Sequence, residues 1–259
     1  LKYKKLIQNS KKVQMDKKLH VYGIRPVLEL LNSGKDIDTI YLQKGLRSDW
    51  SNNIKQKTKE LNINLKIVPK HKLNRLTGKN HQGIIAIISN VTFQNFENLL
   101  SMVFESGQFP LFILLDRITD VRNFGSICRS AEAMGVHGII IPQKESAQIN
   151  EIAIKASAGS ISNIAICREK QLENIVKKAK NNGLNIIACS EKGNKNIQDV
   201  DMNKPILIII GSEKNGISTK LLSLSDDIGK IPIHGKTKSL NAAVAAGIIL
   251  FEYNRQNNL

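Results

Sequence analysis

The sequence is poor in cysteine, and the few cysteines it has are scattered. Its 259 residues include Cys128, Cys167 and Cys189, which form no C-x-x-C pair. An odd number of dispersed cysteines argues against a disulfide framework or a thiolate zinc site and indicates a reducing, intracellular compartment. The five histidines are equally dispersed, so we expect no metal site.

Long apolar runs are also missing. The stretches "PILIII" and "AAVAAGIILF" fall well short of the roughly 20 residues that a membrane span needs. The N-terminus is rich in lysine, but no apolar stretch follows it, so no signal peptide is evident. We therefore expect a cytoplasmic protein without a membrane partner.

Acidic residues are scarce in the first part of the chain. Residues 1–92 contain 19 lysines and arginines against 6 acidic residues, a net charge of +13, whereas residues 93–259 contain 19 against 16, a net of +3. A concentrated positive charge suits a polyanion, because neutralising phosphates releases their condensed counterions. A generally lysine-rich composition is the alternative, and the asymmetry between the two parts weakens it.

The order of the apolar and polar segments predicts two α/β domains. We expect a basic arm at 1–18, a small α/β domain at 19–92, a linker at 93–108 and a larger domain at 109–259. In the larger domain, strands alternate with helices, which is typical of a parallel sheet covered by helices. The expected strands are 39–43, 65–68, 83–89, 111–116, 163–167, 184–189, 205–211 and 227–233, and the expected helices are 23–34, 50–62, 70–78, 169–183 and 239–255. Segment 117–142 is expected to form a loop, a helix that ends before Gly135, and a further strand. The connecting segment 90–110 is expected to contain one short helix.

Common phosphate-binding motifs fail on detail. The stretch "GSEKNGIS" (211–218) has the spacing of a P-loop, but Ile217 stands where the phosphate-binding lysine is needed. The stretch "GKIPIHGKT" (229–237) has one residue too many between its glycines. No G-x-G-x-x-G is present, so the ordinary dinucleotide fingerprint is missing too.

Three other segments carry a resemblance. Together "DRITDVRNFGSICRSAEAMGV" (116–136), "IIIGSEKNGIS" (208–218) and "IPIHGKTKSLNAAVAAGIILFE" (231–252) resemble the three motifs of the SpoU/TrmH family of RNA ribose 2′-O-methyltransferases. The first half, with "HVYGIRPVLELL" and "HQGIIAI", is similar to the substrate-binding domain of members that modify large-subunit ribosomal RNA. The resemblance thus covers nearly the whole chain from His20 to Tyr253.

The resemblance implies a fold, a cofactor and a partner. In the family, the three motif loops form a deep trefoil knot that holds S-adenosylmethionine, and the last helix packs in a homodimer. Carried over by position, the cofactor contacts fall at Gly211, Ile231 and Leu240. The small residues at 242–247 would permit close packing of that helix at the knot or the dimer, or in an ordinary core.

The resemblance also implies the catalytic residues, which fall at Arg129, Asn123, Glu213, Ser239 and Asn241. Arginine is a poor general base, so we expect Arg129 to bind the neighbouring phosphate and stabilise the developing alkoxide. Each residue has a simpler alternative: Asn123, Ser239 and Asn241 could cap helices, Arg129 could be an exposed helix residue, and Glu213 a solvated loop acid.

Two aspartates near the first motif are expected to have a structural role. Asp116 ends a strand and Asp120 lies in the following loop, with no third partner for acid–base chemistry. The sequence favours an S-adenosylmethionine-dependent 23S rRNA guanosine 2′-O-methyltransferase. A tRNA ribose methyltransferase, an adenosine-specific relative and a non-catalytic RNA-binding protein of ribosome assembly remain alternatives.

Overall fold

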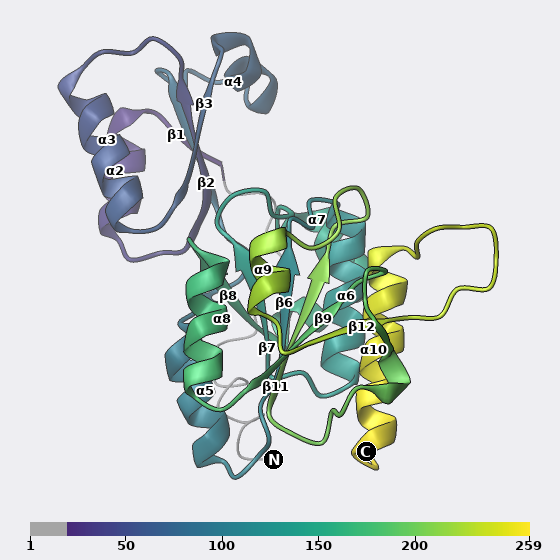
Figure 1. The fold of residues 1–259 in the computed structure, drawn as a ribbon. Helices are drawn as coiled ribbons and strands as arrows, with labels where there is room; N and C mark the ends of the chain where they lie inside the picture. The colour runs from purple at the N-terminus through teal and green to yellow at the C-terminus, as the bar shows by residue number, and fades with distance from the viewer. Residues whose placement is uncertain (1–19) are drawn as a thin grey trace. The chain divides into compact units, whose positions relative to one another are not determined.

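The structure is a computed structural model of the protein, and it describes residues 20–259. The predicted basic arm, residues 1–18, lies outside the described residues. The chain divides between Thr92 and Phe93 into two compact units, and Figure 1 shows both. The α/β fold, with a parallel sheet and a smaller N-terminal unit, is confirmed.

The N-terminal unit is a four-stranded mixed sheet in the order β1-β4-β2-β3. β2 and β3 are parallel, whereas β4 runs antiparallel to both β1 and β2. All six elements predicted for this unit are present, and a three-residue strand, β1, adds one that is too short for a periodic pattern. The elements are β1 (His20–Tyr22), α2 (Ile24–Asn32), β2 (Ile37–Gln43), α3 (Asp49–Glu60), β3 (Asn64–Val68), α4 (Lys70–Leu76) and β4 (Ile84–Ile88).

The first helix of this unit illustrates how the sequence sets its bounds. Pro26 lies in the first turn of α2, where its missing N–H costs no hydrogen bond. Val27, Leu30 and Leu31 are buried at helical spacing against the sheet. Gly34 follows the helix with φ of 69°, a left-handed conformation that favours glycine.

The C-terminal unit is an eight-stranded parallel sheet in the order β10-β12-β9-β11-β6-β7-β8-β5. Helices cover it, as Figure 1 shows. The elements are β5 (Phe93–Gln94), α5 (Phe96–Glu105), β6 (Leu111–Asp116), α6 (Val121–Ala133), β7 (Gly138–Pro142), α7 (Glu151–Ala156), η1 (Ser160–Ser162), β8 (Ala165–Glu169), α8 (Leu172–Asn181), β9 (Asn185–Cys189), β10 (Lys195–Asn196), η2 (Ile197–Asp199), β11 (Ile206–Gly211), α9 (Thr219–Leu224), β12 (Asp227–Lys230) and α10 (Ala242–Gln256).

The segment 93–108, predicted as a linker, is instead part of the larger unit. β5 pairs with β8 at one edge of the sheet. α5 contributes Phe96, Leu99, Leu100 and Val103 to the main core cluster, and the Phe96 ring meets that of Phe112 edge-on at 5.3 Å. These four residues have the i, i+3, i+4, i+7 spacing of a helix with one buried face, which explains why the segment docks.

The strand expected at 227–233 is shorter than predicted. β12 pairs with its neighbours only between Asp227 and Lys230, and Ile231 leaves the sheet. The two short helices α7 and α9 were not predicted at all. α7 packs so closely on α6 that a Cβ at Gly125 would lie 2.5 Å from the Ala153 carbonyl oxygen.

The last helix returns across the sheet. β12 lies beyond β9, yet α10, which follows it, packs against α6 and β11. This return path accords with the predicted knot, which stays a prediction. Within residues 20–259, no helix is both long enough and apolar enough to cross a membrane.

Candidate functional site

The predicted motif residues gather at the carboxyl edge of the parallel sheet. Gly211, the last residue of β11, is paired with Asp116, the last residue of β6. On the other side of β11, Ile210 pairs with Cys189 at the end of β9, and Cys189 pairs with Gly229 of β12. Ligands of parallel α/β sheets bind at this edge, because the loops that follow the strands converge there.

An ion pair within the first motif makes hydrogen bonds to the second motif loop. The Arg117 guanidinium donates through Nε and Nη2 to the two Asp116 carboxylate oxygens, each at 3.0 Å, and through Nη2 to the Gly216 carbonyl at 3.2 Å. The same carboxylate accepts a hydrogen bond from the Ser218 backbone N–H at 2.7 Å. The hydrogen bond to Asp116 raises the pKa of Arg117 above its ordinary value. Asp116 therefore has the structural role that the sequence predicted.

Gly211 is crowded by the loop that follows it. A Cβ at this position would lie 2.2 Å from the Gly216 carbonyl carbon and 2.4 Å from the Ile217 nitrogen. No side chain fits in that space, so the loop folds back tightly over the strand end only because residue 211 is glycine. Ile217 itself is 4% exposed and belongs to the core, so the P-loop spacing found here has no phosphate-binding role.

Glu213 lies at the centre of a polar cluster that connects all three motifs. Its Oε1 accepts hydrogen bonds from Asn123 Nδ2 at 3.0 Å, from Asn241 Nδ2 at 2.6 Å and from the Ala242 backbone N–H at 3.1 Å. Asn241 Nδ2 also lies 3.0 Å from Asn123 Oδ1. We call Asn123, Glu213 and Asn241 the motif cluster. Its carboxylate faces the N-terminus of α10, where the helix dipole favours negative charge.

Of the three residues that could cap helices, only Asn241 does so in the structure. Asp120 caps α6 through hydrogen bonds from the Arg122 and Asn123 backbone N–H groups. Asn241 caps α10, accepting from Ala243 and Val244. Neither Asn123 nor Ser239 is a cap, so the Asn123 side chain is available for the motif cluster.

Two predicted catalytic residues lie apart from the motif cluster. Arg129 is exposed on α6, and a rise of 1.5 Å per residue places it about 9 Å further along the helix than Asn123. No ion pair joins it to another of the described residues. Ser239 is exposed on the loop before α10. In this chain alone, the structure brings together three of the five predicted catalytic residues.

The remaining predicted binding residues flank an exposed loop. Ile231 and Leu240 are half-buried, whereas residues 232–239 between them are exposed. Figure 1 shows this loop extending outward between β12 and α10. Leu240 directly precedes the cap of α10 and thus lies next to the motif cluster. Ile231 continues β12, two strands from Gly211, so the predicted cofactor contacts share one edge of the sheet.

The one cysteine among these strand ends is not suited to nucleophilic catalysis. Burial raises the pKa of Cys189 at the end of β9 to about 12, and nearby Glu191 adds to the shift. The thiol is therefore protonated at neutral pH and is a poor nucleophile. Across residues 20–259, no group of three metal-ligating side chains comes together.

Sequence reasoning missed the contribution of Arg117. Its backbone φ of 58° turns the side chain back onto Asp116, an arrangement that arginine rarely adopts. The only signal in the sequence is the Asp-Arg pair directly after a buried strand. That pair alone does not predict a positive φ.

Two family models match the chain. The model described as "SpoU rRNA Methylase family" matches residues 110–251, and that described as "RNA 2'-O ribose methyltransferase substrate binding" matches residues 20–94. A Staphylococcus haemolyticus protein assigned to the TrmH family of tRNA/rRNA methyltransferases is 32% identical over 238 residues, covering 92% of this chain and 96% of its own. A Bacillus subtilis protein with the same assignment is 29% identical, with the same coverage of both chains.

Solved structures show the same similarity. The SpoU methyltransferase AviRb from Streptomyces viridochromogenes, in complex with AdoMet, is 25% identical with a TM-score of 0.59, covering 99% of this chain and 97% of its own. A TrmH/SpoU tRNA modifying enzyme from A. aeolicus is 28% identical with a TM-score of 0.54, covering 62% of this chain and 85% of its own.

Replacing Asp116 with alanine is expected to loosen the join between the first two motif loops. The change leaves the Arg117 guanidinium and the Ser218 N–H without their partner, and we expect the free energy of unfolding to fall by about 1–3 kcal/mol. Urea denaturation followed by circular dichroism measures the change. The matched control is Lys204→Ala, which breaks an exposed pair with Asp201 and should not measurably change stability. Equal stability of Asp116→Ala and wild type would contradict the structural role of Asp116.

Proposed function

Because the chain belongs to the SpoU/TrmH family of RNA methyltransferases, we propose that it methylates a ribose 2′-hydroxyl of RNA using S-adenosylmethionine, with a guanosine of 23S rRNA as the target. The observation that carries the proposal is the motif cluster. Asn123, Glu213 and Asn241 come from three segments that are 90 and 28 residues apart, and their side chains converge on one carboxylate oxygen.

The carboxyl edge of the sheet fits the cofactor. Adenosine needs backbone hydrogen-bonding groups and an apolar wall, and the chain leaving the sheet at Gly211 and Ile231 offers both. Leu240 adds a second half-buried apolar side chain. The exposed Glu213 carboxylate adds a negative charge to this edge of the sheet, which would suit a positively charged sulfonium. An AdoMet-bound relative with the same fold supports this assignment.

When bound, the cofactor supplies a methyl group on a positively charged sulfur, which is already activated for transfer. The protein then has two tasks: to align the 2′-oxygen with that methyl group and to help the hydroxyl proton leave. In the transfer, the bond from the methyl carbon to oxygen forms as the bond to sulfur breaks, and the hydroxyl proton passes to solvent.

We assign these tasks to the predicted residues. Arg129 binds the phosphate beside the target ribose and stabilises the developing negative charge on the 2′-oxygen, because its guanidinium can engage two oxygens at once. The motif cluster holds the start of α10 and the loop that carries Ser239. Ser239 then orients the nucleotide from that loop.

The N-terminal unit favours a ribosomal substrate over tRNA. Residues 20–94 match a substrate-binding model of RNA 2′-O-ribose methyltransferases. The tRNA modifying enzyme from A. aeolicus aligns with only 62% of this chain. A separate, basic domain suits a large folded RNA and the cytoplasmic location that the sequence predicts. A tRNA target remains the second candidate, supported by the joint tRNA/rRNA assignment of the similar proteins.

We also propose that the chain acts as a homodimer through α10. This helix packs one face on α6, while Val244, Ile248 and Phe251 on another face are exposed by 51%, 36% and 61%. Their i, i+4, i+7 spacing aligns them in a single apolar stripe. A stripe of this kind on an ordered helix suits a copy of the same chain, because a two-fold axis would place the stripe against itself.

Cofactor binding should require no metal and no RNA. Calorimetric titration in EDTA should detect S-adenosylmethionine binding to the wild type. Leu240→Asp should weaken that binding at least about 100-fold, since it places a charge against the apolar wall. The control Leu61→Asp, at a leucine that is 53% exposed in the N-terminal unit, should bind normally. Failure of the wild type to bind at millimolar cofactor would contradict the proposed site.

Arg129→Ala should bind the cofactor normally but lose methyl transfer by a factor of at least about 100, the scale for removing one group that stabilises transition-state charge. A tritiated-methyl assay on unmodified 23S rRNA fragments measures the loss. Lys177→Ala, which removes one exposed charge from α8, is the matched control and should be active. Near-normal turnover by Arg129→Ala would remove this residue from the mechanism.

Phe251→Glu should convert the dimer to a monomer, because it places a charge on the apolar stripe, at its most exposed residue. Light scattering after size-exclusion chromatography gives the mass directly. Phe109→Glu changes a phenylalanine that is 64% exposed outside α10 and should leave the mass unchanged. A monomeric wild type would refute the proposed dimer, and so would a dimeric Phe251→Glu variant.

A further inference from the structure

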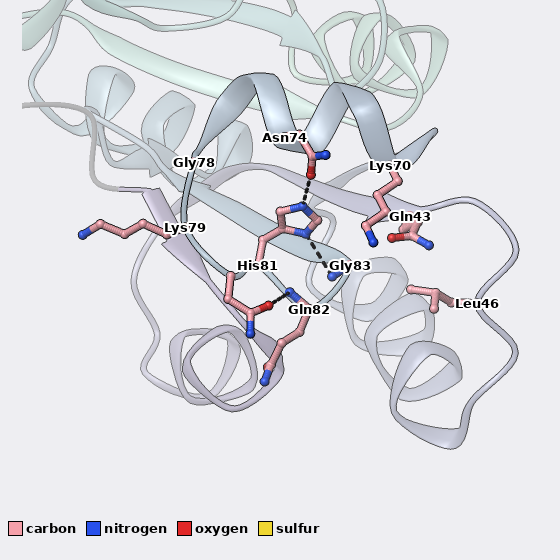
Figure 2. A pocket seen from close by; sticks show the side chains of 10 residues that line it. Gln43, Leu46, Lys70, Asn74, Gly78, Lys79, His81, Gln82 and Gly83 are labelled. Atoms are coloured by element: carbon pink, nitrogen blue, oxygen red, sulfur yellow. Dashed lines mark hydrogen bonds between the residues drawn. The ribbon is translucent and has the colours of Figure 1, made fainter.

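The N-terminal unit contains two adjoining surface cavities with volumes of about 530 and 550 Å³. Both are lined by Asn80 and Gln82, so they form one continuous groove. Its walls come from the start of α2, the end of β2, α4 and the loop 77–83 between α4 and β4. Figure 2 shows the residues that line the first cavity. We call this surface the basic groove.

The loop that forms the floor of the groove is held rigidly. His81 is 5% exposed, and its Nδ1 accepts from the Gly83 N–H at 3.0 Å, so its Nε2 donates to Asn74 Oδ1 at 2.8 Å. Gln82 adopts a φ of 51° and Gly83 a φ of 83°, which turn the chain sharply. A Cβ at Gly83 would lie 2.8 Å from a Leu46 methyl carbon. The groove is therefore preformed, and binding there costs little ordering.

The charge of the groove is of one sign. Arg25, Lys70 and Lys79 line it and are exposed, and no carboxylate is among its lining residues. Residues 20–92 as a whole contain 12 lysines and arginines against 5 acidic residues, a net charge of +7. Three cations around a concave surface without a counter-charge favour a ligand with several phosphates.

An aromatic ring lies beside these cations. Tyr22, at the end of β1, is half-buried and packs against the cluster of Tyr41, Val68, Leu73 and Ile85. The Lys79 ammonium lies over its ring, 5.5 Å from the centroid. A nucleobase can replace Lys79 on this ring, which would free the ammonium for a phosphate. Stacking on aromatic rings next to cations is how proteins bind single-stranded nucleic acid.

Two amide side chains face the same groove with their donors available. Gln82 Oε1 accepts from the Ile24 N–H at 3.0 Å, and Asn80 Oδ1 accepts from the Gln82 N–H at 3.3 Å. With each oxygen engaged, each NH₂ group can donate to an acceptor on a base edge or a phosphate. The groove thus combines charge, a stacking surface and hydrogen-bond donors.

We propose that the basic groove binds an unpaired nucleotide of the RNA substrate, with the base stacked on Tyr22 and the adjacent phosphates held by Lys70 and Lys79. The proposal rests on the proposed function for the nature of the polymer. A base paired within a helix has both faces covered by its neighbours, so the groove selects a single-stranded loop or bulge over a duplex.

The test measures binding by the full chain, without S-adenosylmethionine, to a fluorescein-labelled twelve-nucleotide single-stranded RNA and to a blunt RNA duplex. Anisotropy should show preference for the single strand. Tyr22→Leu should weaken single-strand binding at least about fivefold, while Tyr22→Phe, which keeps the ring, should bind within about twofold of wild type. Thermal melting shows that each variant is folded.

Charge is tested with a matched pair of double variants. Lys70→Ala/Lys79→Ala should lower the slope of log affinity against log salt by about 1.4, which is about 0.7 for each lost contact with a single strand. Lys35→Ala/Lys59→Ala removes the same charge from exposed positions outside the groove and should leave the slope unchanged. Equal slopes for the two double variants would overturn the proposal, and so would duplex preference or normal binding by folded Tyr22→Leu.

A methyl-transfer assay on 23S rRNA fragments separates the two proposals. Groove variants that bind and methylate RNA like the wild type would refute the basic groove alone. A wild type that binds the single strand through the groove but transfers no methyl group would refute the proposed function alone.

Discussion

The Asp116 carboxylate is the interaction on which the arrangement of the motif loops depends. It lies at the end of β6, almost fully buried, and it accepts hydrogen bonds from Arg117 and from the backbone of Ser218. The loop after β11 can reach it only because Gly211 leaves room for the chain to fold back. That loop carries Glu213. A partly buried ion pair and the absence of a side chain at Gly211 thus together place an exposed carboxylate where the first and third motifs meet.

The motif cluster is better explained by binding than by stability. Its side chains are exposed or half-buried, and exposed polar contacts contribute little to the free energy of folding. Yet three segments of the chain contribute to it, and it fixes the N-terminus of α10 next to the exposed loop 232–239. Because the core already holds the helices in place, these solvent-facing hydrogen bonds suit the proposed role of orienting groups for a ligand.

The two units differ in net charge and in the kind of ligand that their surfaces suit. The C-terminal unit, with a net charge of +3, offers backbone groups and half-buried apolar side chains at a sheet edge, which suit a small cofactor. Residues 20–92, with a net charge of +7, offer a concave basic surface with an aromatic ring, which suits a phosphate polymer. Chemistry and RNA recognition would then be separate properties of separate folding units.

The sequence by itself determined the fold class, nearly every strand and long helix, and the segments that meet at the site. Alternating apolar runs predict a parallel sheet, and a parallel sheet brings its loops to one edge. The prediction of a linker at 93–108 with one short helix was wrong about the linker, although the spacing of Phe96, Leu99 and Val103 already indicated a buried helix face. Short elements such as α7 and α9 have too few residues for a period to be recognised.

Only the tertiary structure decided which side chains meet. No local pattern distinguishes Asn123 as a partner of Glu213 from Asn123 as a helix cap, because both uses need the same residue at the start of a helix. In the structure Asp120 caps the helix, and the Asn123 side chain instead donates to Glu213. The basic groove is equally hidden in the sequence, since Tyr22 and Lys79 are 57 residues apart and the antiparallel pairing of β1 with β4 is what brings them together.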